Sequence, residues 1–311
     1  MALPREVLDR AVFAAGDRDY RWADVVAAAR YWSRWAELER RTAQGLAALA
    51  GLNAKIGRAE LDEAKQAFRY AQKLIAAEEM DAWLERWGLD ARDWSGYLRR
   101  QIARERATGE PGSPVDERDV WADAVCSGVL AELARALAGR VAAAEAGGIH
   151  PGPVEPALAR MEAEHAAFMA DALTPEAAAK ALELRNADWV RLSYTALEFP
   201  EAGMASEAAL LVREDRLSPA DVAGRAGVPV EEHEAFLEDV EPGLSESLLS
   251  APTGELVGPL RVDNGFALLR VNGKVAPTLT DPVIQERLRE EVPRRALERE
   301  VRNRVQWHEY L

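Results

Sequence analysis

The sequence contains a single cysteine, Cys126, in a chain of 311 residues. One cysteine cannot form an intramolecular disulfide, which excludes the class of small proteins held together by disulfides. Cys126 lies in an apolar run typical of a helix, and we interpret it as a buried structural thiol. A catalytic thiol at this position is the alternative.

No run of about 18 uninterrupted apolar residues, the length that crosses a bilayer as a helix, occurs in the chain. Near the start, Arg5, Glu6, Asp9 and Arg10 interrupt the stretch in which a secretion signal would be apolar. We therefore expect a cytoplasmic protein with no membrane partner.

Basic residues are outnumbered: 39 Lys and Arg face 53 Asp and Glu, for a formal net charge of -14. A chain this acidic repels phosphate groups, so we expect no nucleic-acid partner. The sequence also lacks a phosphate-binding loop, a dinucleotide fingerprint and the glycines of a serine-hydrolase elbow. A basic or apolar peptide remains a compatible partner.

Histidine is scarce, with only four residues in the chain. His150 and His165 flank a predicted helix start near acidic residues, so a metal site there is conceivable, but solvated helix-surface histidines are commoner. His233 lies in a run of glutamates that we interpret as a charged, solvated helix face. We expect no metal site and no other cofactor.

Residues 1 to about 186 are dominated by alanine, leucine, glutamate and arginine, which favour helices. Apolar residues such as Leu61, Phe68 and Leu74 recur at helical spacing, so we predict an all-helical domain over 1–187. Seven of the nine tryptophans lie before residue 125. We interpret them as core, with an aromatic cleft for extended peptides as the alternative. Loops are predicted at 109–114 and 147–156.

The pattern changes at residue 188. Val190, Leu192, Tyr194 and Ala196 alternate with polar residues, which predicts a half-buried strand that Pro200 ends. Helices are predicted over 203–214 and after Ser218, and residues 230–240 are predicted to be helical or irregular.

A hairpin is predicted farther along, after a short helix. Leu256–Val262 and Phe266–Val271 are apolar strand patterns, and Asp263-Asn264-Gly265 separates them. Asn-Gly favours the positive φ angles that tight hairpin turns require.

The hairpin carries a resemblance to a known family. Gly254-Glu255-Leu256-Val257-Gly258-Pro259-Leu260, followed by Gly265-Phe266-Ala267, resembles the end of parvulin-type prolyl isomerases. There a "GE-I-S-x-P-V" turn leads into a strand and "GYH" opens the last strand. The histidine of that motif, at the floor of the active site, is Ala267 in this chain. The resemblance implies an α+β fold with a small parvulin-like domain and antiparallel sheet at 188–278.

Two further segments resemble SurA-like chaperones of the same family. Residues 68–101 resemble their N-terminal helical domain. A helix is predicted from Val283 to about Tyr310, kinked or broken at Pro293 and striped with apolar residues up to Trp307. The resemblance implies that this segment, 279–311, packs back on the helical domain, because an isolated amphipathic helix needs a surface to cover.

The resemblance also implies the composition of the site. Active parvulins set an apolar pocket against two histidines and a Cys or Asp, but the first predicted strand here lacks histidine and the second position is Ala267. No catalytic residue is therefore predicted, and only the apolar wall of the pocket remains. The predicted peptide-binding residues are Leu192, Tyr194, Leu244, Leu248, Leu249, Phe266 and Leu268.

We therefore expect a non-catalytic or weakly active SurA- and parvulin-like protein that binds unfolded or precursor peptides as a chaperone or accessory factor. A peptide-modifying enzyme is a further candidate partner. The first alternative is an active peptidyl-prolyl cis-trans isomerase. The second is a peptide-maturation enzyme or accessory protein, of the kind that tailors ribosomal peptides, which reuses the scaffold.

Overall fold

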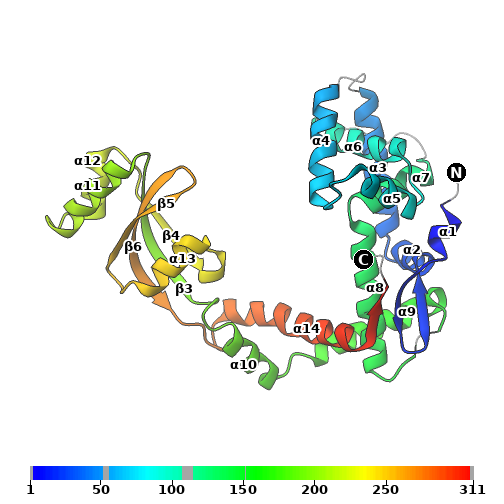
Figure 1. The fold of residues 1–311 in the computed structure, drawn as a ribbon. Helices are drawn as coiled ribbons and strands as arrows, with labels where there is room; N and C mark the ends of the chain where they lie inside the picture. Colours follow the sequence, from blue (N-terminus) through cyan, green and yellow to red (C-terminus); the bar gives the residue numbers. More distant parts are fainter. Residues whose placement is uncertain (1–2, 52–55, 107–114, 151, 309–311) are drawn as a thin grey trace. The chain divides into compact units, whose positions relative to one another are not determined.

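The computed structural model describes residues 3–51, 56–106, 115–150 and 152–308. The chain forms two compact units (Figure 1): unit 1 comprises Met1–Asp171 and Arg295–Leu311, and unit 2 comprises Ala172–Arg294. Helices dominate, and each unit holds one small antiparallel sheet, which confirms the predicted α+β class. The loop predicted at 109–114 lies outside the described residues.

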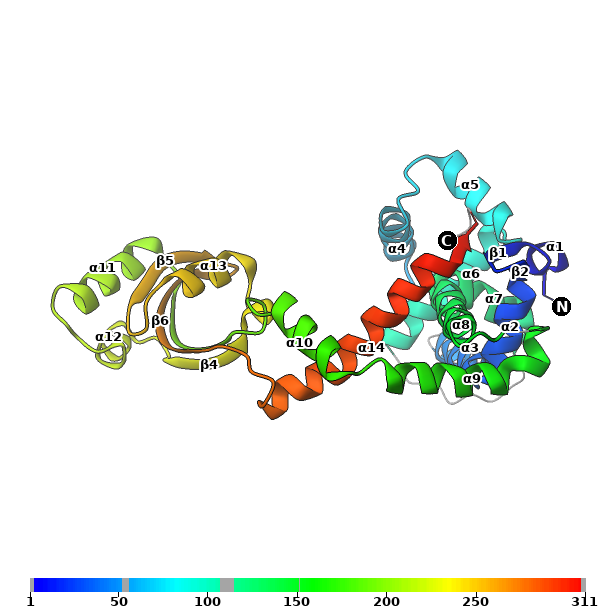
Figure 2. The ribbon, with the colours of Figure 1, turned by 90° about the horizontal axis from the view of Figure 1, so that it is seen from below.

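The helices of unit 1 are α1 (Arg5–Leu8), α2 (Trp22–Tyr31), α3 (Arg34–Gly51), α4 (Arg58–Ala71), α5 (Ala77–Arg86), α6 (Ala91–Arg106), α7 (Glu117–Cys126), α8 (Val129–Ala146) and α9 (Val154–Asp171). Helices α2, α7 and α9 pack on α8, which is seen nearly end-on in Figure 2, and α3 packs on α6 and α7. Most residues of α8 are alanine, leucine or valine, and the buried ones let neighbouring helices approach closely because most of them are small.

Most of the tryptophans before residue 125 form core, as predicted, and Trp32 and Trp83 pack against that core while partly exposed. Trp22, Trp35 and Trp121 are at most 2% exposed. Trp22 and Trp121 both contact Trp87, with ring centroids 5.0 and 6.4 Å from that ring, and Trp121 Nε1 donates to the Trp87 carbonyl at 2.9 Å. Such aromatic pairs add to the stability that burial alone provides.

The prediction of an all-helical N-terminal domain is wrong at its beginning. A three-stranded sheet in the order β2-β1-β7 joins β1 (Ala11–Ala15), β2 (Arg18–Arg21) and β7 (Val305–Trp307). Phe13 stacks on Tyr20 at 4.7 Å and meets Trp307 edge-on at 5.4 Å. Gly16 supplies the positive φ of 59° in the turn between β1 and β2.

The predicted helix at the C-terminal end is shorter than expected. Helix α14 spans Pro282–Arg304 and contains Pro293 without ending there. Residues 305–307 leave the helix because their backbone pairs with β1, and Trp307 stays 37% exposed rather than buried in a stripe. Tyr310 lies outside the described residues.

The boundary between the units falls within α14. Its first part, in unit 2, packs Ile284, Leu288 and Val292 against Trp189 and α10 (Pro175–Leu184). Its last part belongs to unit 1, where Leu297 lies over Gly139 of α8. The C-terminal segment thus belongs to unit 1 from Arg295 onward, whereas the preceding part of α14 belongs to unit 2. Helix α10, placed in the first domain by the sequence, lies in unit 2.

Unit 2 contains a four-stranded antiparallel sheet in the order β4-β3-β6-β5. Its remaining elements are β3 (Arg191–Phe199), α11 (Ala202–Arg213), α12 (Pro219–Ala226), β4 (Glu231–Phe236), the 3-10 turn η1 (Leu237–Asp239), α13 (Pro242–Ser250), β5 (Leu256–Val262) and β6 (Gly265–Val275). The predicted hairpin is confirmed as β5 and β6, whose register pairs Val262 with Gly265. The helical or irregular prediction for 230–240 is wrong, because residues 231–236 form the edge strand β4.

No helix in the described part of the chain has both the length and the apolar character to span a membrane.

Candidate peptide-binding surface

The sheet of unit 2 has two covered faces (Figure 1). On one, α11 and α12 pack against Leu197, Phe199 and Leu268. On the other, α13 and η1 pack against Leu192 and Ala267. Cross-strand register explains the separation, because directly paired residues such as Leu197 and Leu268 share a face.

Position 267 lies on the α13 face of the sheet. Ala267 is 2% exposed and pairs with Glu198 of β3 and Leu260 of β5. Leu260 has no polar side-chain group, and an ionised carboxylate such as that of Glu198 accepts but cannot donate a hydrogen bond. The immediate neighbours of this position on the two adjacent strands therefore supply no hydrogen-bond donor through their side chains.

Two glycines keep the backbone close around position 267. A Cβ on Gly258, where φ is +109°, would lie 2.6 Å from the carbonyl oxygen of Ala267. A Cβ on Gly265, where φ is +145°, would lie 2.2 Å from the carbonyl oxygen of Phe199. Glycine is the residue that tolerates both the angle and the contact. Close backbone packing therefore requires glycine at both of these positions in the motif that resembles parvulins.

The predicted peptide-binding residues lie on two different faces of the sheet. Leu192 and Leu248 are buried on the α13 face, and Tyr194 and Leu244 are partly exposed there. Phe266 and Leu268 belong to the opposite face, against α11 and α12. Leu249, on α13, is 40% exposed.

Burial decides which of these residues could touch a ligand. Leu192, Leu248 and Leu268 are at most 1% exposed, so they support the surface from beneath. Direct contact with a peptide stays a prediction for Tyr194, Leu244 and Leu249 on one face and for Phe266 on the other.

Helix α13 is fastened to the sheet by a lysine. Lys274 of β6 donates from Nζ to the carbonyl of Ala251 at 2.6 Å and to that of Leu249. These carbonyls lie at the end of α13, where backbone acceptors lack partners within the helix. The lysine therefore fixes the position at which Leu249 is displayed.

A histidine that the sequence analysis assigned to a charged helix lies instead on the sheet. His233 of β4 pairs with Tyr194 of β3, and their rings stack with centroids 5.1 Å apart. Burial raises the pKa of the Tyr194 hydroxyl, and Glu231 lies 3.4 Å from His233 Nε2. The run Glu231-Glu232-His233-Glu234 is polar throughout and carries no strand alternation, so its pairing with β3 had no local signal in the sequence.

A second feature missed from the sequence lies between α11 and α12. A hollow of about 170 Å³ is lined by Met204, Leu211 and Val222, among others. Met204 is 37% exposed there. The amphipathic pattern of α12 was visible in the sequence, but the separation between the helices depends on tertiary packing.

The remaining chemical candidates are accounted for by packing. Within the described residues, no group of three His, Cys, Asp or Glu side chains is placed to hold a metal ion. Burial and the nearby Arg140 charge lower the pKa of His165. Cys126 is buried, as predicted, and burial raises the pKa of its thiol strongly, which disfavours the reactive thiolate.

Comparison with known proteins gives matches among solved structures alone. No family model matches the chain, and no curated protein does. The chain is similar to one of two SurA-like chaperones of Campylobacter jejuni, with 9% identity over 97% of this chain and 100% of the other, at a TM-score of 0.23. It is also similar to the foldase PrsA of Lactococcus lactis (9% identity, 97% and 96% coverage, TM-score 0.28).

A third match is the peptidylprolyl isomerase PrsA of Bacillus cereus, with 10% identity, 95% and 91% coverage and a TM-score of 0.26. At such identities and TM-scores, function has to be argued from the residues of the site.

Proposed function

We propose that this chain binds extended apolar segments of unfolded polypeptide and does not catalyse prolyl isomerisation. The observation that argues against prolyl isomerisation is the environment of Ala267. It is buried on the α13 face, and its direct cross-strand neighbours are a leucine and a carboxylate.

Catalysis would need more than this surface offers. Rotation about an amide bond faces a barrier of about 18–20 kcal/mol. An enzyme lowers it through interactions that are stronger in the twisted amide than in the planar one. An alanine offers no hydrogen bond to the twisted amide, and ionised Glu198 offers no donor.

Binding needs less. Leu249 at 40% exposure and the partly exposed Tyr194, Leu244 and Leu260 offer apolar area around α13. An apolar peptide side chain gains about 25 cal/mol for each Å² that it removes from water. This supports retention of an unfolded client. The cytoplasmic location and a peptide-modifying enzyme as partner stay predictions.

A rearranged isomerase is the second candidate, and the stacked Tyr194 and His233 favour it. This pair provides a hydroxyl and an imidazole on one sheet face. Tyr194 pairs with Val271, which is four residues from Ala267 on β6. At about 3.3 Å per residue, the pair lies roughly 13 Å from position 267. The pair would therefore have to form a different site rather than complete the one around Ala267.

We expect binding and isomerisation to separate in one sample. A peptide with one Xaa-Pro bond is mixed with the full chain, and its proton NMR spectrum and cis-trans exchange spectrum are recorded. The peptide resonances should shift or broaden, while no exchange cross-peaks appear within the mixing time, because uncatalysed exchange takes tens to hundreds of seconds. Ala267→His should behave in the same way, because it restores only one of the missing polar groups and β3 still contains no histidine.

Exchange cross-peaks with the wild-type chain would refute the non-catalytic assignment. If they disappeared in His233→Ala, the rearranged isomerase would be the correct function. A peptide spectrum that the protein leaves unchanged would count against peptide binding itself.

A further inference from the structure

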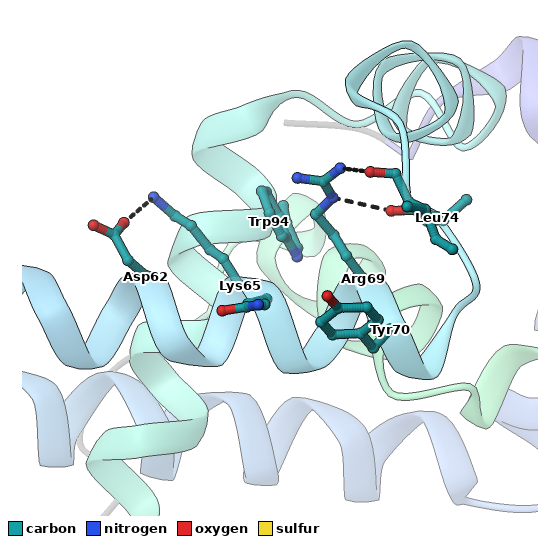
Figure 3. Close-up of a pocket in the computed structure, with 8 residues that line it drawn as sticks. Asp62, Lys65, Arg69, Tyr70, Leu74 and Trp94 are labelled. Atoms are coloured by element: carbon teal, nitrogen blue, oxygen red, sulfur yellow. Dashed lines mark hydrogen bonds and ion pairs between the residues drawn. The ribbon is translucent and has the colours of Figure 1, made fainter.

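A hollow of about 470 Å³ lies in unit 1. Figure 3 shows it between α4, the turn that follows α4, and Trp94 of α6. Its lining includes Lys65, Arg69, Tyr70, Leu74, Ile75 and Trp94. Its volume lies within the range of about 300–1,000 Å³ typical of ligand pockets.

The apolar part of the lining is unusually exposed. Tyr70 is 63% exposed and Ile75 is 72% exposed. The turn that carries Ile75 is held in place by Arg69, whose Nε donates to the Leu74 carbonyl at 3.0 Å and whose Nη2 donates to the Ile75 carbonyl. The exposed apolar residues are therefore displayed by a fixed turn.

Trp94 supplies a polar group to the same hollow. The residue is 8% exposed, and its ring lies 5.7 Å from that of Phe68. Its Nε1 is buried and has no hydrogen-bond partner among the described residues. Figure 3 shows this nitrogen directed toward the side of α4 that carries Lys65 and Tyr70. Buried donors without an acceptor are rare in native proteins and costly to stability.

We infer that this hollow binds an apolar segment of an extended polypeptide, with Trp94 Nε1 donating to a backbone carbonyl of that segment. This rests on the proposed function and adds to it a second contact site, in unit 1. The segment's apolar side chain packs on Tyr70 and Ile75. Lys65, already paired with Asp62 at 3.4 Å, borders the hollow and moves aside as the carbonyl enters.

The chemistry of the lining selects this occupant. An apolar molecule without an acceptor would cover Ile75 and leave the Trp94 N–H unsatisfied. Every residue of an extended polypeptide carries a backbone carbonyl. An unfolded chain also presents apolar side chains next to those carbonyls, so a single segment satisfies both requirements of the hollow.

The direct test observes the indole N–H of Trp94. The full chain, labelled with ¹⁵N-tryptophan, gives one indole signal for each of its nine tryptophans, and Trp94→Phe identifies the signal of Trp94. The probe is a leucine-rich peptide capped with acetyl and amide groups. On titration, the Trp94 indole proton should shift downfield as it gains an acceptor. The matched control is Trp35, whose buried Nε1 also lacks a partner among the described residues but does not line the hollow.

Affinity supplies the second readout. Ile75→Ser alters a side chain that is 72% exposed, so the fold should be kept, and Trp94→Phe removes the donor but keeps most of the ring. Each should weaken binding of the capped peptide about threefold to tenfold, the usual worth of one lost contact or hydrogen bond. Leu184→Ser, at a 62% exposed position in unit 2, is the matched control and should leave the affinity unchanged.

The outcomes separate the two proposals. If the wild-type chain binds the peptide while the Trp94 signal stays in place and Ile75→Ser binds equally well, the hollow is not the site and the proposed function stands. If the peptide binds neither the wild-type chain nor any variant, both proposals fail. An indole proton of Trp94 that is already hydrogen-bonded in the unliganded protein, with slow solvent exchange, would also refute the role given to it.

Discussion

Replacing Asp123 with alanine is expected to lower the free energy of unfolding of unit 1 by about 3–5 kcal/mol. Asp123 is 5% exposed, and its Oδ1 accepts from Nη2 of Arg100 at 2.6 Å. Its Oδ2 accepts from Thr42 at 3.0 Å and lies 3.6 Å from Nη1 of Arg104. The substitution would remove two of the hydrogen bonds of the Arg100 guanidinium, in a residue only 2% exposed, and leave it Asp119, at 2.8 Å, as counter-charge.

This loss would be a large share of a total stability of about 5–15 kcal/mol. Urea unfolding followed by tryptophan fluorescence measures it, because eight of the nine tryptophans lie in unit 1. Asp123→Asn, which keeps the shape, provides a second variant if the alanine protein does not fold. Glu37→Ala breaks a solvent-exposed pair with Arg34 and should cost less than about 1 kcal/mol. Equal stabilities for the Asp123 and Glu37 variants would contradict the role of the buried network.

Ending the chain at Arg294 is expected to lower the melting temperature of unit 1 by about 10 °C. The truncation removes the contact of Leu297 with α8, the β7 strand, and the edge-on contact of Trp307 with Phe13. It also removes the hydrogen bond from the His308 amide to the Val12 carbonyl. Each partly buried side chain contributes about 1 kcal/mol to the free energy of unfolding. Each kcal/mol lost lowers the melting temperature by about 2–4 °C in a unit of this size, so the loss of several side chains gives a decrease of this magnitude.

Calorimetry of the truncated and full chains checks the second prediction. Trp307→Ala alone should cost less than the truncation, because Trp307 is 37% exposed. Val283→Ala, at a 45% exposed position in the first part of α14, is the control and should leave the melting temperature nearly unchanged. A truncated chain that melts with the full chain would show that the C-terminal segment is not part of unit 1.

The sequence predicted the elements whose signals are local. Asn264-Gly265 between two apolar runs marked the β5–β6 hairpin, because a two-residue turn constrains both strands next to it. Thr174 and Ser218 marked helix starts, and each side chain accepts from a backbone amide of the first turn. Such signals depend on a few neighbouring residues and can be recognised without tertiary contacts.

The elements that were missed depend on distant partners. Strand β7 is a three-residue strand whose pairing with β1 joins residues at opposite ends of the chain. Strand β4 is an exposed edge rich in glutamate, a residue that favours helices, and its pairing with β3 decides its conformation.

The sequence did not predict that the candidate peptide-binding residues divide between two faces of the sheet, and their contact with a peptide stays a prediction. Ala267 and Leu192 share a face, whereas Phe266 and Leu268 face α11 and α12. A bulge in the β3–β6 pairing between Ser193 and Tyr194 shifts the register, and no local pattern encodes it. The unpartnered Trp94 N–H likewise depends on the packing of α4 against α6.

Binding of a permanently unfolded protein tests the central claim most directly. A reduced, carboxymethylated and fluorescently labelled client is titrated with the full chain, and its fluorescence anisotropy is followed. The account predicts a saturable rise with the unfolded client and none with the same protein in its native, disulfide-bonded form. An anisotropy that stays constant with the unfolded client, or rises equally with the native one, would contradict it.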